Sequence, residues 1–378
     1  MKGYYFHNMD VLSTRAHACQ ILNTAVAIDS KLSLCLVLPK YDGKVDFDVV
    51  KRNHDLPRMP ELILLRNFGI QKSGIAASAL FNISAIWFFL QKKLGKNASF
   101  LYFRSSYFLP LAIVSYIFRV PFFYETHRRP VSWSERQRDH LMSMLASGII
   151  VISNYMREHY LPYKKRMLVA HDAVSLKRFA KSAANASRKE AKERFGLAPE
   201  EKVCVYAGTI SKLKGMEYAI GAARLLPKVN FLLAGIVSPE FADAILPSNV
   251  KIVGKMEQKE LPNMLQAADV LLLPHPKGEY SQSPMKLFEY MASGVPIVAS
   301  RLPSISEVLN DENAVLVEPE NEKILALGIE KALGDANFSR IIAERAYNDV
   351  QNYTWDKRGS VIAGFIKDTL EIQHKKYQ

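Results

Sequence analysis

Short apolar runs alternate with segments of helical periodicity along most of the chain. The apolar runs have the composition of strands that are buried on both faces, and they occupy residues 4–7, 32–39, 61–65, 100–103, 121–124, 148–152, 203–207, 230–234, 250–253, 270–273 and 295–299. Most are separated by amphipathic helical segments. This alternation predicts parallel sheets wound with helices on both faces, in which ligands bind at the carboxyl ends of the strands.

The alternation occurs in two series, which predicts two domains in a chain of 378 residues. We assign residues 1–172 to an N-terminal domain, 173–352 to a C-terminal domain, and 353–378 to a final long helix. Residues 179–200 are rich in Lys, Ala, Ser and Asn and predict a linker with a short surface helix. Residues 40–58 predict a polar loop, and residues 305–309 a short helix.

Two apolar stretches, at residues 74–90 and 108–118, are candidates for membrane contact. The first contains Ser and Asn and is followed by a lysine pair, and the second is too short to span, since a spanning helix needs ~20 apolar residues. We therefore predict buried or interfacial helices at both places.

The segment 281–296 predicts one helix with capping residues at both ends. Ser283 is a suitable N-cap, Pro284 fits the first helical position, and Gly294 suits the closing position. Such a helix start favours a phosphate, and a side chain at Glu289 leans back toward it, where a carboxylate could hold a sugar hydroxyl. The pattern indicates a nucleotide-sugar pocket; the alternative is an ordinary capped helix with Glu289 solvated.

A second candidate is the loop at residues 208–215, between a strand and a helix. Gly208 and Gly215 permit close backbone approach, and Lys214 brings a mobile positive charge. The loop has neither the Walker order nor the dinucleotide glycine pattern. A diphosphate leaving group could lie between this loop and the helix, neutralised by Lys214 and Lys286 without a metal.

In the N-terminal half, His127 is expected at the carboxyl end of a strand, flanked by Glu125. A structural role for this histidine remains an alternative to catalysis. The pair Asp46 and Asp48 resembles a metal-binding Asp-x-Asp, but one such pair in a charged loop is weak evidence.

The distribution of charge and the cysteine content limit the possible binding partners and the cellular compartment of the protein. Residues 1–180 contain 25 Lys+Arg and 12 Asp+Glu, so they carry the whole net charge of +13, while the remainder has 25 of each. This asymmetry favours contact with a polyanion such as anionic lipid headgroups, a lipid diphosphate or nucleic acid; plain solubility is the alternative. Cys19, Cys35 and Cys204 have no paired or metal-type spacing, which fits a reduced cytosolic compartment, and the N-terminus lacks a signal-peptide pattern.

Taken together, these residues resemble glycosyltransferase family 4, the group 1 glycosyltransferases of GT-B fold. Residues 283–299 are similar to the donor-site signature of that family, and residues 206–215 are similar to its diphosphate loop. Residues 124–127 resemble the segment with its active-site histidine, and residues 353–355 the start of its last helix. The resemblance implies an α/β fold of two Rossmann-like parallel-sheet domains facing across a cleft, with the last helix packing back on the N-terminal domain.

The resemblance also implies residue roles. The active-site group would comprise His127, Glu125, Lys214 and Glu289, with Glu289 on the ribose. The donor would contact Gly208, Thr209, Lys214, Gly215, Met256, Ser281, Ser283, Pro284, Met285, Lys286, Leu287 and Glu289. We assign the acceptor to Arg15, Arg104 and Arg128, and expect neither a metal nor another cofactor.

Three positions depart from the family pattern. Ser281 stands where an acidic residue is usual, Thr209 where arginine is frequent, and residues 8–15 replace an N-terminal Gly-Gly loop. Lys214 would therefore carry more of the diphosphate charge.

The leading hypothesis is a retaining, metal-independent transferase that moves a hexose-type sugar from a UDP- or GDP-linked donor. The acceptor would be a lipid-linked or envelope saccharide, as in lipopolysaccharide or capsule synthesis, with no nucleic acid involved. The protein would be cytoplasmic or peripheral on the inner face of the cytoplasmic membrane. The alternatives are a nucleotide-sugar epimerase of the same fold and a non-catalytic nucleotide-sugar-binding partner of a transferase complex.

Overall fold

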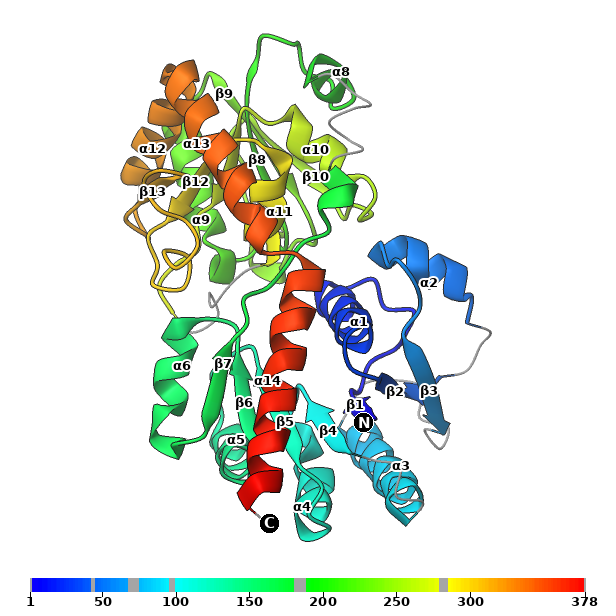
Figure 1. Ribbon diagram of the computed structural model, residues 1–378. Helices are drawn as coiled ribbons and strands as arrows, with labels where there is room; N and C mark the ends of the chain where they lie inside the picture. The colour runs from blue at the N-terminus through cyan, green and yellow to red at the C-terminus, as the bar shows by residue number, and fades with distance from the viewer. Residues whose placement is uncertain are drawn as a thin grey trace. The chain divides into compact units, whose positions relative to one another are not determined.

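The computed structural model describes residues 2–41, 45–66, 75–94, 99–179, 188–278 and 285–376 (Figure 1). The chain divides into two compact units. Unit 1 consists of Met1–His171 together with Trp355–Gln378, and unit 2 of Asp172–Thr354. Each unit contains one parallel sheet with helices on both faces, so the predicted α/β class is confirmed.

The described residues of unit 1 form a seven-stranded parallel sheet of order β3-β2-β1-β4-β5-β6-β7. Its strands are β1 (Gly3–Phe6), β2 (Leu34–Lys40), β3 (Glu61–Arg66), β4 (Phe100–Phe103), β5 (Phe122–Thr126), β6 (Gly148–Val151) and β7 (Arg166–Val169). Successive side chains point to opposite faces, so Tyr5 lies in one core while Tyr4 and Phe6 lie in the other.

Different sets of helices cover the two faces of this sheet. One face packs against α1 (Ala16–Asp29), α2 (Phe47–His54) and α14 (Trp355–Lys376). The opposite face packs against α3 (Ile75–Leu94), α4 (Leu109–Ile117), α5 (Trp133–Leu145) and α6 (Asn154–Tyr160). Gly359 lets α14 approach α1 closely, since a Cβ atom there would lie 2.5 Å from the carbonyl carbon of Ala27.

The described residues of unit 2 form a six-stranded parallel sheet of order β10-β9-β8-β11-β12-β13. Its strands are β8 (Lys202–Ala207), β9 (Val229–Ala234), β10 (Val250–Gly254), β11 (Val270–Leu273), β12 (Ile297–Ser300) and β13 (Val315–Val317). One face carries α9 (Met216–Leu225) and α12 (Glu322–Gly334), and the other α10 (Leu261–Ala267), α11 (Met285–Ser293) and α13 (Ala336–Asp349). The short α8 (Arg188–Glu193) contacts α10.

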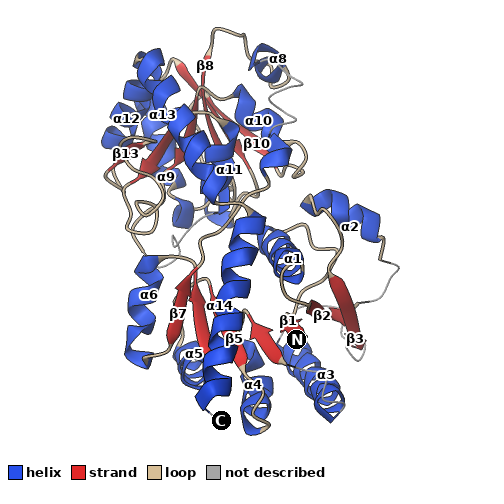
Figure 2. Ribbon diagram, in the orientation of Figure 1, coloured by secondary structure: helices blue, strands red, loops and turns tan. Residues whose placement is uncertain are grey.

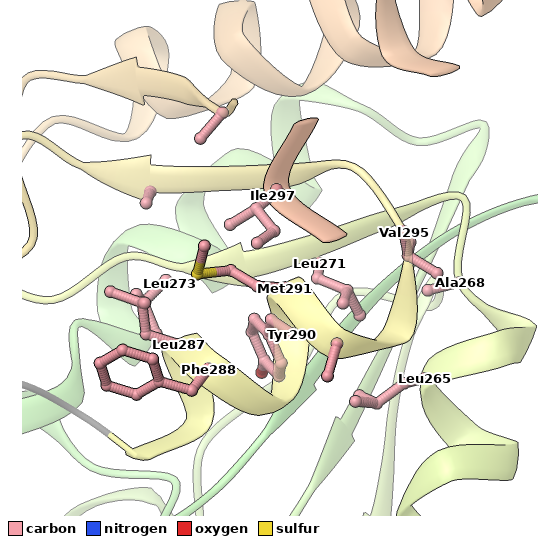
Figure 3. Close-up of a cluster of buried hydrophobic side chains, with 14 of the residues drawn as sticks. Leu265, Ala268, Leu271, Leu273, Leu287, Phe288, Tyr290, Met291, Val295 and Ile297 are labelled. Carbon is pink, nitrogen blue, oxygen red and sulfur yellow. The ribbon is translucent and has the colours of Figure 1, made fainter. Parts of the chain in front are cut away.

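Helix α11 is anchored by its apolar side chains. Leu287, Phe288, Tyr290 and Met291 are fully buried, and Figure 3 shows them packed with Leu271, Leu273 and Ile297 of the neighbouring strands. Gly294 follows the helix with φ +67°, which confirms it as the closing residue. The predicted N-terminal residues Ser283 and Pro284 lie outside the described residues.

Two local predictions are wrong. Residues 40–58 are not simply a loop, because Asp46 caps helix α2, its carboxylate accepting from the amides of Asp48 and Val49 at 2.9 and 3.1 Å. The first acidic residue of the Asp-x-Asp pair is therefore a helix cap. Residues 305–309 form turns instead of a helix. Their backbone amides donate hydrogen bonds to the carbonyl groups of Leu302 and Ile305.

Among the described residues, no helix combines the length and the apolarity needed to cross a bilayer.

Candidate functional site

Three adjacent strands of unit 1 end in side chains that gather at one edge of the sheet. His7 follows β1, Arg104 follows β4, and His127 follows β5, and these three strands are neighbours in the order β1-β4-β5. The rings of His7 and His17 lie 6.4 Å apart, and Arg104 Nη1 is 3.5 Å from the His17 carbonyl oxygen. The carboxyl edge of this sheet therefore brings several nitrogen-bearing side chains together, where open α/β sheets bind ligands.

His127 is held at both ring nitrogens. Nε2 contacts Glu125 Oε1, and Gln20 Nε2 lies 3.1 Å from Nδ1, while Gln20 Oε1 accepts from Arg104 Nη2. Burial, with the charge on Arg104, lowers the pKa of His127 to about 3. The hydrogen-bond network thus assigns a neutral imidazole that donates from Nε2 to Glu125 and accepts at Nδ1 from Gln20.

Glu125 is a buried carboxylate with three partners. Arg358 Nη2 lies 2.6 Å from Oε1, His127 donates to the same oxygen, and Tyr102 Oη donates to Oε2. Burial by itself would raise the pKa of Glu125, but Arg358, His127 and Arg104 outweigh it and hold the pKa well below its usual range. The ionised carboxylate therefore orients His127.

The predicted acceptor arginines do not all point to this cluster. Arg104 is part of it. Arg15 is exposed at the start of α1, and its charge helps to lower the pKa of His17, although burial and the charge on Arg104 have larger effects. Arg128 instead pairs with Glu135, with Nη2–Oε1 and Nη1–Oε2 distances of 2.6 and 3.1 Å. That pairing lowers the pKa of Glu135 to about 2.

In unit 2, the loop at residues 208–215 closely approaches two other segments. A Cβ atom on Gly208 would overlap Lys286 Nζ, and one on Gly215 would overlap the Pro274 carbonyl oxygen. Gly215 also has φ +72°, a conformation that favours glycine. The two glycines therefore allow the loop to lie against helix α11 and the segment after β11.

Two lysines, Lys214 in this loop and Lys286 on α11, lie close enough for the charge of the first to act on the second. Lys286 Nζ donates to Tyr206 Oη at 2.7 Å and lies 4.0 Å from the ring centroid, and Tyr206 Oη donates to the Thr209 carbonyl oxygen at 2.9 Å. Burial and the charge on Lys214 lower the pKa of Lys286 well below its usual range, and burial lowers the pKa of Lys214. No ion pair among the described residues includes either lysine, although the charge on Glu289 partly opposes the lowering of the pKa of Lys286.

Glu289 is largely buried instead of solvated. Its Oε1 lies 3.6 Å from Arg178 Nη1, which donates to Gln258 Oε1 at 3.0 Å. Burial raises the pKa of Glu289, with Arg178 and Lys286 opposing it. Arg178 is a site residue that the sequence reading missed, because it precedes a segment without periodicity.

His275, which follows β11, is the least expected member of this group. It is fully buried, and neither ring nitrogen has a hydrogen-bond partner of acceptable geometry among the described residues. Burial and the charges on Lys286 and Lys214 lower the pKa of His275 well below its usual range. A neutral histidine therefore lies near both lysines at the strand end, and its position after an apolar strand was the only sequence signal.

The remaining predicted donor residues lie at varied depths. Leu287 is fully buried, so only its backbone could face a ligand, while Met285 and Met256 are half-buried and Thr209 is exposed. Met256 packs against the hydrophobic core. Ser281, Ser283 and Pro284 lie outside the described residues.

A surface hollow of about 550 Å³ lies elsewhere in unit 2. Its lining includes Lys202, Asp269 and Pro296, which stand at the amino ends of β8, β11 and β12. Open parallel sheets bind ligands at the opposite, carboxyl ends, so we place the candidate site at the lysine pair instead. The described residues contain no group of three or more His, Cys, Asp or Glu side chains arranged to hold a metal.

The two all-parallel sheets have the fold of GT-B glycosyltransferases. Anabaena HepE in complex with UDP and glucose is similar with a TM-score of 0.73 and 18% identity, covering 97% of this chain and 100% of that one. Sucrose-phosphate synthase from Thermosynechococcus elongatus has a TM-score of 0.73 and 17% identity, covering 98% and 100%. At these identities the likeness shows the fold alone.

Residues 187–349, which make up most of unit 2, match the family of glycosyl transferases group 1. An uncharacterized glycosyltransferase of Methanocaldococcus jannaschii is 26% identical over 189 residues, covering 47% of this chain and 48% of that protein. The alpha-D-kanosaminyltransferase of Streptomyces kanamyceticus is 25% identical over 253 residues, covering 62% and 63%. The D-inositol 3-phosphate glycosyltransferase of Salinispora tropica is 25% identical over 230 residues, covering 55% and 45%. The chain thus spans about half to three-fifths of the length of these relatives, and the group 1 resemblance is confirmed for this segment.

Proposed function

We propose that this protein is a retaining, metal-independent glycosyltransferase of family 4 type. It transfers a hexose-type sugar from a UDP- or GDP-linked donor to a lipid-linked or envelope saccharide. The observation that supports this most is the pairing of Lys214 and Lys286 beside two glycines, inside the segment that matches the group 1 family.

The lysine pair accounts for donor binding in this proposal. Desolvation and mutual repulsion lower the pKa of Lys286, which means that the charged form is costly without an anion. A diphosphate placed there would neutralise both lysines, and the start of α11 would add its free amides. The same positive groups would stabilise the charge that grows on the leaving diphosphate as the glycosidic C–O bond breaks, so no metal or other cofactor is required.

Glu289 and Arg178 would lie beside the ribose. A carboxylate 3.6 Å from a guanidinium retains oxygen lone pairs that can accept from the two sugar hydroxyl groups. Arg178 opposes the effect of burial on the pKa of Glu289 and so favours its ionised form, and the pair would act as one recognition unit.

Unit 1 would supply the acceptor site and His127. Because His127 is neutral and both its ring nitrogens are engaged by Glu125 and Gln20, it would contribute the position of its ring instead of a positive charge. The charges on Arg15 and Arg104 would attract an acceptor that carries a phosphate or diphosphate, with His17 beside them as a neutral hydrogen-bonding group. An acceptor of this kind fits a cytoplasmic protein that works at the inner membrane surface and does not bind nucleic acid.

A panel of nucleotide sugars tests the donor assignment. A UDP- or GDP-linked sugar at 100 times its Kd should stabilise the protein by ~2.7 kcal/mol, measured as a rise in melting temperature. Lys214→Ala and Glu289→Ala should each abolish this rise and the transfer reaction. The exposed pair Lys259 and Glu257 provides matched controls, and Lys259→Ala and Glu257→Ala should behave as wild type.

Two results would overturn the proposal. One is that no nucleotide sugar of the panel stabilises the protein, which would favour a non-catalytic partner in a transferase complex. The other is conversion of the donor sugar to its epimer in the absence of any acceptor, which would indicate an epimerase.

A further inference from the structure

A long stretch of unit 1 contains no carboxylate. Between Glu61 and Glu125 the sequence has no Asp or Glu and seven Lys or Arg. Helices α3 and α4 both belong to this stretch. Any surface that these helices present to solvent is therefore apolar, neutral or positive.

The outward faces of α3 and α4 are strongly apolar. Both helices pack on the same face of the sheet, through Phe81 and Phe89 of α3 and Leu111 of α4. The sides turned away from the sheet expose large side chains, with Trp87 65% and Ile117 68% exposed. We call the following set the apolar band: Ile83, Trp87, Ile113, Tyr116, Ile117 and Phe118.

The apolar band spans two helices that pack against each other. α3 and α4 (Figure 2) contact each other. Beneath the band, the ring of the buried Phe89 meets that of Phe118 edge to face, with centroids 6.3 Å apart. Lys92 follows Trp87 by five positions on α3, with Nζ 5.6 Å from the ring centroid of Phe88, and the exposed Arg119 directly follows Phe118. The band therefore has positive groups at its rim.

We propose that the apolar band is a membrane-docking surface that inserts into the headgroup region of an anionic bilayer. Exposed clusters of large apolar residues are uncommon on proteins that stay in water. Trp and Tyr favour the boundary between headgroups and acyl chains, and Lys and Arg near it favour anionic lipid. The helices keep their inner faces on the sheet, so only their outer faces enter the lipid.

Charge favours a membrane over a second copy of the chain as the occupant. A self-association through this band would bring one carboxylate-free, positive surface against another, which is repulsive. An anionic leaflet presents the opposite charge together with an apolar layer. This inference rests on the proposed membrane-linked acceptor, but its test needs neither donor nor acceptor, so the two can fail separately.

Vesicle co-sedimentation tests the proposal with the full chain. The wild type should bind vesicles that contain phosphatidylglycerol and bind pure phosphatidylcholine vesicles at least tenfold more weakly. The double variant Trp87→Ser/Ile117→Ser should bind the anionic vesicles at least tenfold more weakly than the wild type. Ile245, 90% exposed in unit 2, provides the matched control, and Ile245→Ser should bind as wild type.

Tryptophan quenching keeps the test independent of variant folding. In a Trp133→Phe background, brominated anionic lipid should quench Trp87 fluorescence, because Trp355 is buried. The proposal is overturned if the wild type ignores anionic vesicles, if Trp87 is not quenched, or if the band and control variants bind equally. A dimer that dissociates in the band variant, with no vesicle binding by the wild type, would instead assign the band to a second copy.

Discussion

At the scale of single residues, Tyr206 connects two segments that meet the proposed donor. Its hydroxyl group accepts from Lys286 of α11 and donates to the carbonyl oxygen of Thr209 in the loop. Its ring also faces the lysine at 4.0 Å. One side chain therefore sets the distance between the loop and the helix.

Removing only this hydroxyl group should weaken donor binding. Tyr206→Phe keeps the ring and its contact with Lys286, but it removes a hydrogen bond to a charged group, worth about 1.5–3 kcal/mol. We expect the affinity for UDP or GDP to fall about tenfold or more, since ~1.4 kcal/mol corresponds to tenfold, measured by calorimetry.

Tyr290→Phe is the matched control for this variant. The hydroxyl group of Tyr290 accepts from the amide of Ala207 at 2.8 Å, so its loss should lower the melting temperature more than the nucleotide affinity. Equal losses of affinity in the two variants would show that Tyr206 has only a general structural role.

The protonation state of His127 gives a second prediction at this scale. Its pKa is lowered to about 3 mainly by burial, so the ring should stay neutral from pH 8 to pH 5, against an ordinary value of ~6.5. An NMR titration of 13C-labelled histidine, with the signal assigned through His127→Gln, measures this directly. A midpoint near pH 6.5 would contradict the network as described.

The same shift has a consequence for stability. The unfolded chain takes up a proton at His127 near pH 6.5, while the folded chain does so only near pH 3. The free energy of unfolding therefore decreases progressively as the pH falls through this window. In His127→Gln the slope of the unfolding free energy against pH should be smaller there, by the equivalent of about one bound proton.

Sequence patterns located some of these residues and not others, for a physical reason. A position directly after an apolar strand is visible in the sequence, and His127 and Arg104 are indeed placed there. Contacts such as Arg178 with Glu289, or Arg358 with Glu125, join residues more than 100 positions apart. Periodicity contains no information about such pairs, so they emerge only from the fold.

At the scale of elements, apolar strands and long amphipathic helices were predictable, whereas short elements were not. Helix α2 was not predicted, because only Val50 and His54 of its residues are buried and its strongest sequence signal was the capping residue Asp46. The three-residue strand β13 is too short to show alternation. Helix α4 was expected to be buried or interfacial, and it buries one side on the sheet while exposing Ile113, Tyr116 and Ile117.

At the scale of the whole molecule, the final helix belongs to the compact unit that begins the chain. Arg358 of α14 donates to Thr24 of α1 at 3.1 Å, to the carbonyl oxygen of His171 at 3.0 Å, and to Glu125 of β5 at 2.6 Å. One buried guanidinium therefore joins segments from both ends of the sequence. Both members of the Arg358–Glu125 ion pair have side chains no more than 3% exposed.

Breaking this pair from one side should destabilise unit 1 strongly. Arg358→Leu leaves the Glu125 carboxylate buried without its main counter-charge, and such losses cost about 3–5 kcal/mol. All three tryptophans, Trp87, Trp133 and Trp355, lie in unit 1, so their fluorescence during urea unfolding reports this unit. Arg58→Leu, which breaks the more exposed pair with Asp29, is the control and should cost at most about 1 kcal/mol.

A double variant separates the buried charge from simple loss of packing. Glu125→Gln removes the charge but keeps a side chain that can still hydrogen-bond to Tyr102 and His127. If the unpaired carboxylate causes the loss, Arg358→Leu/Glu125→Gln should recover at least half of the stability that Arg358→Leu loses. If the double variant is as unstable as Arg358→Leu, the arginine stabilises unit 1 through its contacts with Thr24 and His171, and the ion pair contributes little.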